Sequence, residues 1–212
     1  MVQRLKTARE KWFGLIKTAY LFTFPFLVIL GVITLLMAFS FTGVDRTETF
    51  QFSMLVWIGV LIPLAMFIHG VVSRHRLLKR ITRSMKDPQY FWPSAGYEIY
   101  HKGDGKYLGI DTNKGTLLYI HRIRKGQVDV LGLTVNDLTE LELVGNGLLR
   151  LYTKHPELPC IEIGTPWAKL WCDTLGAMEH RQPQTPLPFR EYVNDYIDTL
   201  EQANRVHIPR FA

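Results

Sequence analysis

The sequence predicts a membrane-anchored α+β protein, in which a two-helix transmembrane hairpin precedes a small antiparallel β-barrel or sandwich closed by a C-terminal helix. Three observations carry this prediction: two long uncharged stretches, a run of short strands separated by turn residues, and an amphipathic helix after them. We expect a basic N-terminus at 1–17, the hairpin with its basic extension at 18–86, a linker at 87–96, a strand domain with a capping helix at 97–181, and a C-terminal helix and tail at 182–212.

The two uncharged stretches are long enough to cross a bilayer. Residues 18–44 carry no formal charge, and residues 49–73 contain only His69 as an ionisable group. Since crossing the hydrocarbon core takes about 20 apolar residues, we expect spans at 19–43 and 50–72. The residues from Val44 to Thr49 leave room only for a turn, so the two helices should form a hairpin.

Charge asymmetry predicts the topology. Residues 1–86 hold twelve Lys and Arg against three acids, whereas the remainder has a small acidic excess. The basic excess therefore belongs to the anchor, and no nucleic acid is expected as a partner. The positive-inside rule predicts a multi-pass protein of the bacterial inner membrane with both termini in the cytoplasm. The basic flanks before and after the spans are Arg4, Lys6, Arg9, Lys11 and Lys17, and Arg74, Arg76, Lys79, Arg80, Arg83 and Lys86, against Arg46 alone in the loop.

The flank after the second span, Arg74, Arg76, Lys79, Arg80 and Arg83, has two interpretations. In the first, these residues orient the hairpin and touch anionic lipid headgroups. In the second, they form a specific site for a lipid or a partner.

Residues 97–163 read as short strands joined by turns. Residues 107–111 and 116–120 flank Asn113 and Gly115, residue types that tolerate positive φ, so this segment should be a hairpin. Alternation of Leu with Glu140 and Glu142 predicts a further strand at 138–144. A helix with Trp167, Leu170, Trp171, Leu175 and Met178 on one face should follow, and a second helix should run from 188 to 204.

The sequence gives little reason to expect catalysis. Cys160 and Cys172 have no partner at metal-binding spacing, and reducing cytoplasm argues against a disulfide between them. Gly103-Asp-Gly105 lacks the lysine and helix of a phosphate loop. A solvated strand face explains the pair Glu140 and Glu142. We therefore expect a non-enzyme with no cofactor and no metal.

The candidate partner-binding residues are aromatic and arginine side chains, which dominate the energy of many interfaces. Arg122 and Arg124 belong to the one basic cluster of the strand domain, with a solvated hairpin turn as the simpler interpretation. Tyr192 and Tyr196 share a face of the last helix, which can pack on the barrel or bind a partner helix. A homo-oligomer is compatible with the same features.

Residues 97–180 resemble a bacterial pleckstrin-homology-like domain. The resemblance lies in YLGIDTNKGTL at 107–117, in LLRLYTKHPELPCIEI at 148–163, and in the helix that follows. It implies seven short strands closed by one helix, and it places the basic cluster of Arg122 and Arg124 in a loop near a headgroup site.

The whole chain also resembles the surface exclusion proteins of IncI-type conjugative plasmids, in its layout, its opening RLKTAREKW at 4–12 and the strand motifs above. The resemblance implies a protein of the recipient's inner membrane that blocks redundant transfer. Its expected partner is a membrane component of the donor's type IV secretion apparatus. The alternative is a structural or assembly subunit of a bacterial membrane complex, and a membrane-bound enzyme ranks last.

Overall fold

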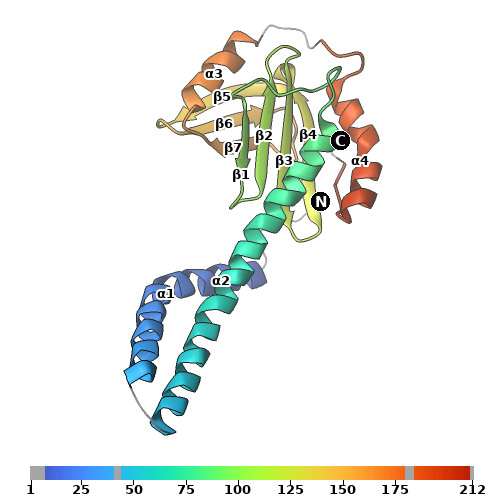
Figure 1. Cartoon of the computed structure of the whole chain (residues 1–212). Coiled ribbons are helices and arrows are strands. Elements are labelled where there is room, and N and C mark those ends of the chain that lie inside the picture. Colours follow the sequence, from blue (N-terminus) through green and yellow to red (C-terminus); the bar gives the residue numbers. More distant parts are fainter. Residues whose placement is uncertain (1–7, 41–43, 180–183, 211–212) are drawn as a thin grey trace. The chain divides into compact units, whose positions relative to one another are not determined.

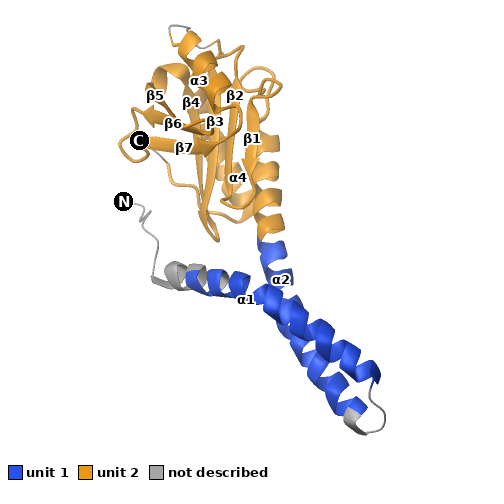
Figure 2. Ribbon diagram, turned by 90° about the vertical axis from the view of Figure 1, so that its left-hand side faces the viewer, with its two compact units in different colours: residues 1–70 blue, residues 71–212 orange. Residues whose placement is uncertain are grey.

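The computed structural model describes residues 8–40, 44–179 and 184–210, and Figure 1 shows the order of the elements. The chain divides into two compact units, residues 1–70 and residues 71–212 (Figure 2). Parts of three predicted features lie outside the described residues: the basic N-terminus at 1–7, the end of the first span at 41–43, and the connection to the last helix at 180–183.

Two long helices form the first unit. α1 runs from Ala8 to Ser40, and α2 runs from Val44 to Met85 and so continues into the second unit. Both are long and apolar enough to cross a membrane, judged by length and composition. The predicted loop at 44–49 is wrong, because α2 already begins at Val44. That segment contains no Gly or Pro that would stop a helix.

Within the first unit, α1 and α2 lie close together. The Tyr20 hydroxyl donates a hydrogen bond to the Val60 carbonyl at 2.7 Å. A Cβ atom added to Gly31 would lie 3.1 Å from the Trp57 ring, so the glycine permits the close approach. Large side chains such as Phe26 are exposed on the outer faces. Helices that are apolar on every face are typical of protein interiors or of lipid surroundings.

The second unit contains a four-stranded antiparallel sheet in the order β1-β2-β3-β4. Gly115 adopts positive φ at the turn of the predicted β2–β3 hairpin, which confirms that hairpin, and Gly126 does so in the turn between β3 and β4. The strand bounds are Glu98–His101, Lys106–Asp111, Thr116–Arg124 and Gln127–Thr134.

A separate three-stranded antiparallel sheet follows, with the order β5-β6-β7 and the bounds Leu138–Val144, Leu148–Thr153 and Cys160–Gly164. The two sheets do not close into a barrel, so the barrel alternative is wrong. A 3-10 turn at Val135–Asp137 separates β4 from β5, and Asp137 accepts hydrogen bonds from the backbone N–H and the hydroxyl of Thr134. This turn ends the first sheet. The resemblance of residues 97–180 to a pleckstrin-homology-like domain stays a prediction.

One core lies between the inner faces of the two sheets and α3, which runs from Ala168 to Ala177. Trp171 is fully buried there, and its indole N–H donates to the Gly96 carbonyl at 3.1 Å. Leu175 is buried beside it. Trp171 is therefore a core residue.

A second core covers the other face of the first sheet. It combines the end of α2, through Leu78, Ile81 and Met85, with α4, which runs from Phe189 to Asn204. A Cβ atom on Gly132 would lie 2.5 Å from Val193 Cγ2 and 3.0 Å from the Phe189 carbonyl oxygen. Glycine at this point of β4 is what allows α4 to pack so closely.

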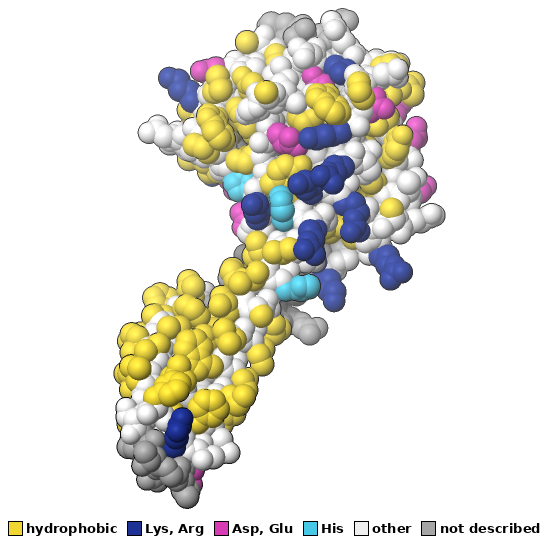
Figure 3. All heavy atoms as spheres, in the orientation of Figure 1, with side chains coloured by type: hydrophobic (Ala, Val, Ile, Leu, Met, Phe, Trp, Pro, Cys, Tyr) yellow, Lys and Arg dark blue, Asp and Glu magenta, His cyan; other side chains and the backbone are white. Residues whose placement is uncertain are grey.

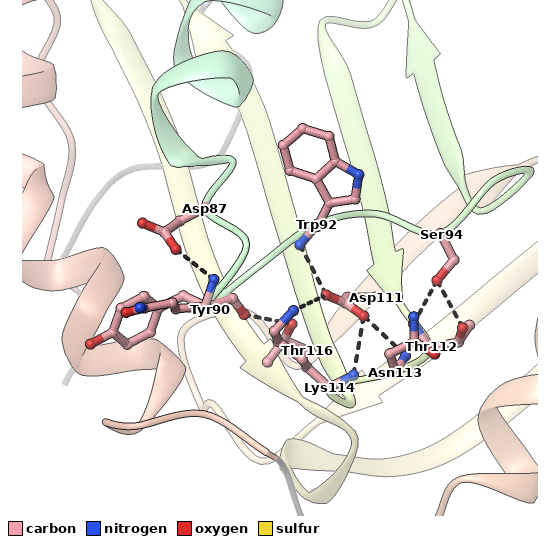
Figure 4. A network of polar contacts seen from close by, with 10 residues as sticks. Asp87, Tyr90, Trp92, Ser94, Asp111, Thr112, Asn113, Lys114 and Thr116 are labelled. Atoms are coloured by element: carbon pink, nitrogen blue, oxygen red, sulfur yellow. Dashed lines mark hydrogen bonds and ion pairs between the residues drawn. The ribbon is translucent and has the colours of Figure 1, made fainter.

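The segment 87–96, predicted as a linker, is ordered and bonded to the β2–β3 turn (Figure 4). The buried Asp111 carboxylate accepts hydrogen bonds from the backbone N–H groups of Trp92, Asn113 and Lys114, at 2.9, 3.0 and 3.1 Å. The Thr116 hydroxyl donates to the Tyr90 carbonyl at 3.2 Å. These bonds fix the path of the chain from the end of α2 into the sheet.

Candidate functional site

A group of cationic side chains from three elements comes together in the second unit. Arg74 on α2 donates a hydrogen bond from Nη1 to the carbonyl of Gly103, in the β1–β2 turn, at 2.6 Å. Gly105 in the same turn has a φ of 68°, and a Cβ there would lie 3.3 Å from Arg122 Cβ and 3.6 Å from Arg74 Cδ. The turn therefore lies between the helix and β3, with one arginine on each side.

Electrostatics shows that these cations act on one another. Burial and the charge of Arg74 lower the pKa of the Arg122 guanidinium. Burial and the charges of Lys102 and Lys79 lower the pKa of His75, beyond the apolar stretch of α2. We call the cations Arg74, Lys79, Lys102 and Arg122, together with His75, whose lowered pKa favours the uncharged imidazole, the basic surface. Figure 3 shows Lys and Arg side chains gathered over the upper half of α2 and the adjoining edge of the strand domain.

A polar cluster holds the end of α2 against β1 and β2 beside the basic surface. The Glu98 carboxylate contacts Lys86 Nζ at 2.8 Å and accepts hydrogen bonds from the Tyr100 and Tyr107 hydroxyls at 2.9 and 3.2 Å. Burial, above all, raises the pKa of both tyrosines, so their hydroxyls remain protonated donors. The His75 ring meets the Tyr100 ring edge-on at 5.5 Å. The contacts of Glu98 thus connect the end of α2 with β1 and β2.

The structure joins two sets of residues that the sequence treated separately. Arg74 came from the group predicted to orient the hairpin, and Arg122 from the candidate partner-binding group, yet they are neighbours. Arg124 ends β3 next to the β3–β4 turn. The side chains of Arg76, Lys79, Arg80 and Arg83 are exposed along α2. Roles in lipid or partner binding stay predictions for all of them.

The two predicted anchor tyrosines of α4 have different environments. Tyr192 is only 7% exposed and stacks on Tyr90, with ring centroids 4.1 Å apart and an interplanar angle of 10°. Burial raises its pKa. Tyr196 is 38% exposed and meets the Tyr192 ring at 4.9 Å. Tyr192 thus belongs mainly to the core, and Tyr196 offers the accessible ring.

The apolar face predicted for α3 divides into a buried and an exposed part. Trp171, Leu175 and Met178 are buried, whereas Trp167 is 53% and Leu170 50% exposed. The helix begins at Ala168, so Trp167 stands just before its first turn. Sequence periodicity placed all of these side chains on one apolar face of the helix. It cannot show how much of that face the sheets cover, because covered and uncovered apolar positions recur with the same spacing.

Of the predicted acidic pair, Glu142 belongs to a ladder of partly exposed charges across the second sheet, whereas Glu140 lies opposite Tyr152. Glu142, Arg150 and Glu162 are register partners on β5, β6 and β7. Arg150 contacts Glu142 Oε2 at 3.3 Å and Glu162 Oε1 at 2.8 Å. Hydrogen bonds from Tyr152 and Arg150 lower the pKa of Glu142, which favours an ionised carboxylate. The ladder is a cross-strand pairing on a sheet surface.

The two cysteines are half-buried, one on β7 and one on α3. Burial raises the pKa of both the Cys160 and the Cys172 thiol, which disfavours the thiolate that a nucleophile or a metal ligand requires. Within residues 8–40, 44–179 and 184–210, no three His, Cys, Asp or Glu side chains group as metal ligands would.

Sequence reasoning missed His75 and Lys102 as members of the basic surface. Lys102 is a single basic residue directly after β1. The contact that brings its turn to α2 joins Arg74 and Gly103, which are 29 residues apart in the chain. A usable signal existed in the glycines around Asp104, because two glycines in four residues predict a tight turn. The sequence did not reveal which helix this turn would meet.

Comparison with known proteins supplies the family. No curated protein and no solved structure matches the chain. A family model described as exclusion-determining protein matches residues 1–212, which include both apolar helices and both sheets. The chain therefore belongs to the exclusion-determining protein family.

Proposed function

We propose that this protein is an inner-membrane plasmid exclusion protein that blocks redundant conjugative transfer into its host by binding a membrane component of the donor's type IV secretion apparatus. Family membership supports a role in plasmid exclusion. One observation carries the proposed membrane location and binding role. The family match includes two helices of membrane-spanning length and a folded domain with exposed aromatic and partly exposed arginine side chains.

The proposed topology places the hairpin in the membrane and both termini in the cytoplasm. Its support is the distribution of charge: basic residues flank the two apolar stretches at 1–17 and 74–86, while Arg46 is the only one between them. Confinement to the membrane raises the effective concentration of the domain near a membrane partner. A modest affinity is then enough for exclusion.

Binding, rather than turnover, is the proposed mode of action. The accessible side chains suited to an interface are Tyr196 on α4, and Trp167 and Leu170 around α3. Exposed aromatic rings and arginines are the residue types that anchor protein–protein interfaces. We propose Tyr196 and Arg124 as partner contacts, with Trp167 as an added candidate that the structure exposes.

A mating experiment tests this proposal. Plasmid-free recipients expressing the full chain are mated with a donor that carries the plasmid from which the gene comes and with a donor of an unrelated conjugation system. We expect the frequency of transfer to fall for the first donor only. Equal transfer into expressing and empty recipients would contradict an exclusion role.

A second mating experiment distinguishes an exclusion protein from the alternative, a structural or assembly subunit of a membrane complex. Loss of such a subunit would lower transfer when the gene is deleted in the donor, whereas loss of an exclusion protein leaves donor ability intact. A photo-crosslinking amino acid at position 196, compared with one at the exposed Gln202 on the same helix, then tests for the partner. Adducts with a secretion component at 196 support the proposed interface.

A further inference from the structure

We propose that the basic surface is a membrane-docking surface, through which the β1–β2 turn and the end of β3 bind the anionic headgroups of the bilayer that holds the hairpin. The ligand is a surface of anionic phospholipid. This inference rests on the proposed membrane hairpin, and it adds that the strand domain itself makes a lipid contact.

The geometry sets the cations on a common surface. Arg74 is bonded to the β1–β2 turn through the Gly103 carbonyl, and Arg122 N–H donates to the Gly105 carbonyl at 2.8 Å. One four-residue turn is therefore held from both sides, by α2 and by β3. Its position 102 carries an exposed lysine. Cations that are distant in sequence are brought together by hydrogen bonds to two carbonyl groups of this turn, one from the Arg74 side chain and one from the Arg122 backbone.

The charges on this surface repel one another. Burial first, and then the charge of Arg74, lowers the pKa of Arg122, and burial followed by the charges of Lys102 and Lys79 lowers the pKa of His75. Asp104, exposed in the same turn, is the one acid within the turn itself. A fold that gathers cations in this way has a field that attracts anions, and binding an anionic surface relieves the repulsion.

Chain continuity favours lipid over an acidic protein as the occupant. α2 is one unbroken helix from Val44 to Met85, and its apolar stretch ends at Ser73, one residue before Arg74. At about 1.5 Å of rise per residue, Arg74 lies within one helical turn of the end of the apolar stretch. In the proposed topology Arg74 therefore follows the membrane-spanning segment directly in the chain, and the β1–β2 turn is hydrogen-bonded to it.

The test uses the full chain in vesicles of phosphatidylcholine with or without phosphatidylglycerol. A fluorophore is attached at Gly103→Cys, with Gly176→Cys as the control, in a background where Cys160 and Cys172 are replaced by Ser. Neither glycine has another atom within 4 Å of the added Cβ, so both sites accept a label. Quenching by a nitroxide on the lipid headgroup reports proximity to the bilayer.

We expect strong quenching at position 103 that needs phosphatidylglycerol, and weak quenching at 176. Each cation near an anionic surface should contribute about fivefold to the docked fraction relative to the undocked fraction. Arg122→Gln and Lys102→Gln should each lower that ratio by about this factor, while Lys169→Gln, which removes an exposed cation on α3, should not. Raising the salt to about 1 M shortens the screening length to about 3 Å and should release the turn.

Two outcomes separate this inference from the proposed function. If the chain inserts into the vesicles but the quenching at 103 is independent of phosphatidylglycerol and of Arg122, the docking surface is wrong and the hairpin stands. If the chain fails to insert and washes off the vesicles at alkaline pH, the membrane hairpin fails, and docking through this surface fails with it.

Discussion

The end of α2 should be part of the folded strand domain, and removing it should unfold the domain. Leu78, Ile81 and Met85 are each fully buried in the second core. Burial of one such side chain is worth about 1.5–3 kcal/mol, so the three together contribute about 5–9 kcal/mol. A domain of this size has a free energy of unfolding of about 5–15 kcal/mol. Loss of the helix end therefore removes at least about a third of this free energy, and all of it for a domain in the lower half of the range.

The assay compares two fragments, residues 71–212 and residues 89–212, in urea unfolding followed by tryptophan fluorescence and circular dichroism. We expect the longer fragment to unfold in one cooperative transition and the shorter one to be largely unfolded or aggregated in buffer. The longer fragment also keeps the contact of Lys86 with Glu98 at 2.8 Å.

Single substitutions sharpen the comparison within the longer fragment. Ile81→Ala should cost about 2–5 kcal/mol, since it leaves a cavity in a packed core. Arg80→Ala, next to it on the exposed side of the helix, should change the stability by less than about 0.5 kcal/mol. If residues 89–212 alone unfold cooperatively with a stability within about 1 kcal/mol of the longer fragment, the assignment of this helix end to the core is refuted.

Three further predictions follow from the packing and the charge pattern. Trp171→Ala should cost about 3–5 kcal/mol in urea unfolding because its ring is fully buried, whereas Trp167→Ala should cost less than about 1 kcal/mol; equal costs would contradict the division of this face. Gly132→Ala should destabilise by about 1–3 kcal/mol through its clash with α4, while Gly176→Ala, in open space on α3, should stabilise by about 0.5–1 kcal/mol. A reporter enzyme active only in the periplasm should be silent when fused after Ala212, and strong activity would overturn the proposed topology.

Local signals predicted the strands and turns well, because these depend on nearby residues. The alternation at 138–144 and the turn at Gly115 correspond to observed elements. The apolar stretches likewise correspond to helices of membrane-spanning length. These features can be predicted from the spacing of apolar residues along the chain and from the backbone conformations that single residues such as glycine allow.

Features that depend on long-range contacts could not be predicted. The sequence did not show that the 3-10 turn at 135–137 divides the strands into two sheets. It also did not show that Leu78 and Ile81, which belong to the predicted basic extension, are buried in the second core. In α4, Tyr192 and Tyr196 share a face by periodicity, yet Tyr90 covers the first ring and leaves the second half-exposed. The neighbourhood of Arg74 and Arg122 likewise depends on a long-range contact, the hydrogen bond between Arg74 and Gly103.

The most direct test of the central claim, that the protein excludes plasmids by binding from a membrane anchor, is the mating frequency of recipients at matched protein levels. The recipients express the full chain, residues 71–212 alone, or the full chain with Glu162→Gln, a conservative change in the exposed ladder on β7. We predict strong exclusion by the full chain, weak exclusion by the fragment, and no loss of exclusion with Glu162→Gln. Exclusion by the fragment equal to that of the full chain would contradict the role of the anchor. Abolition by Glu162→Gln in a folded protein that still binds its partner would contradict a binding mechanism.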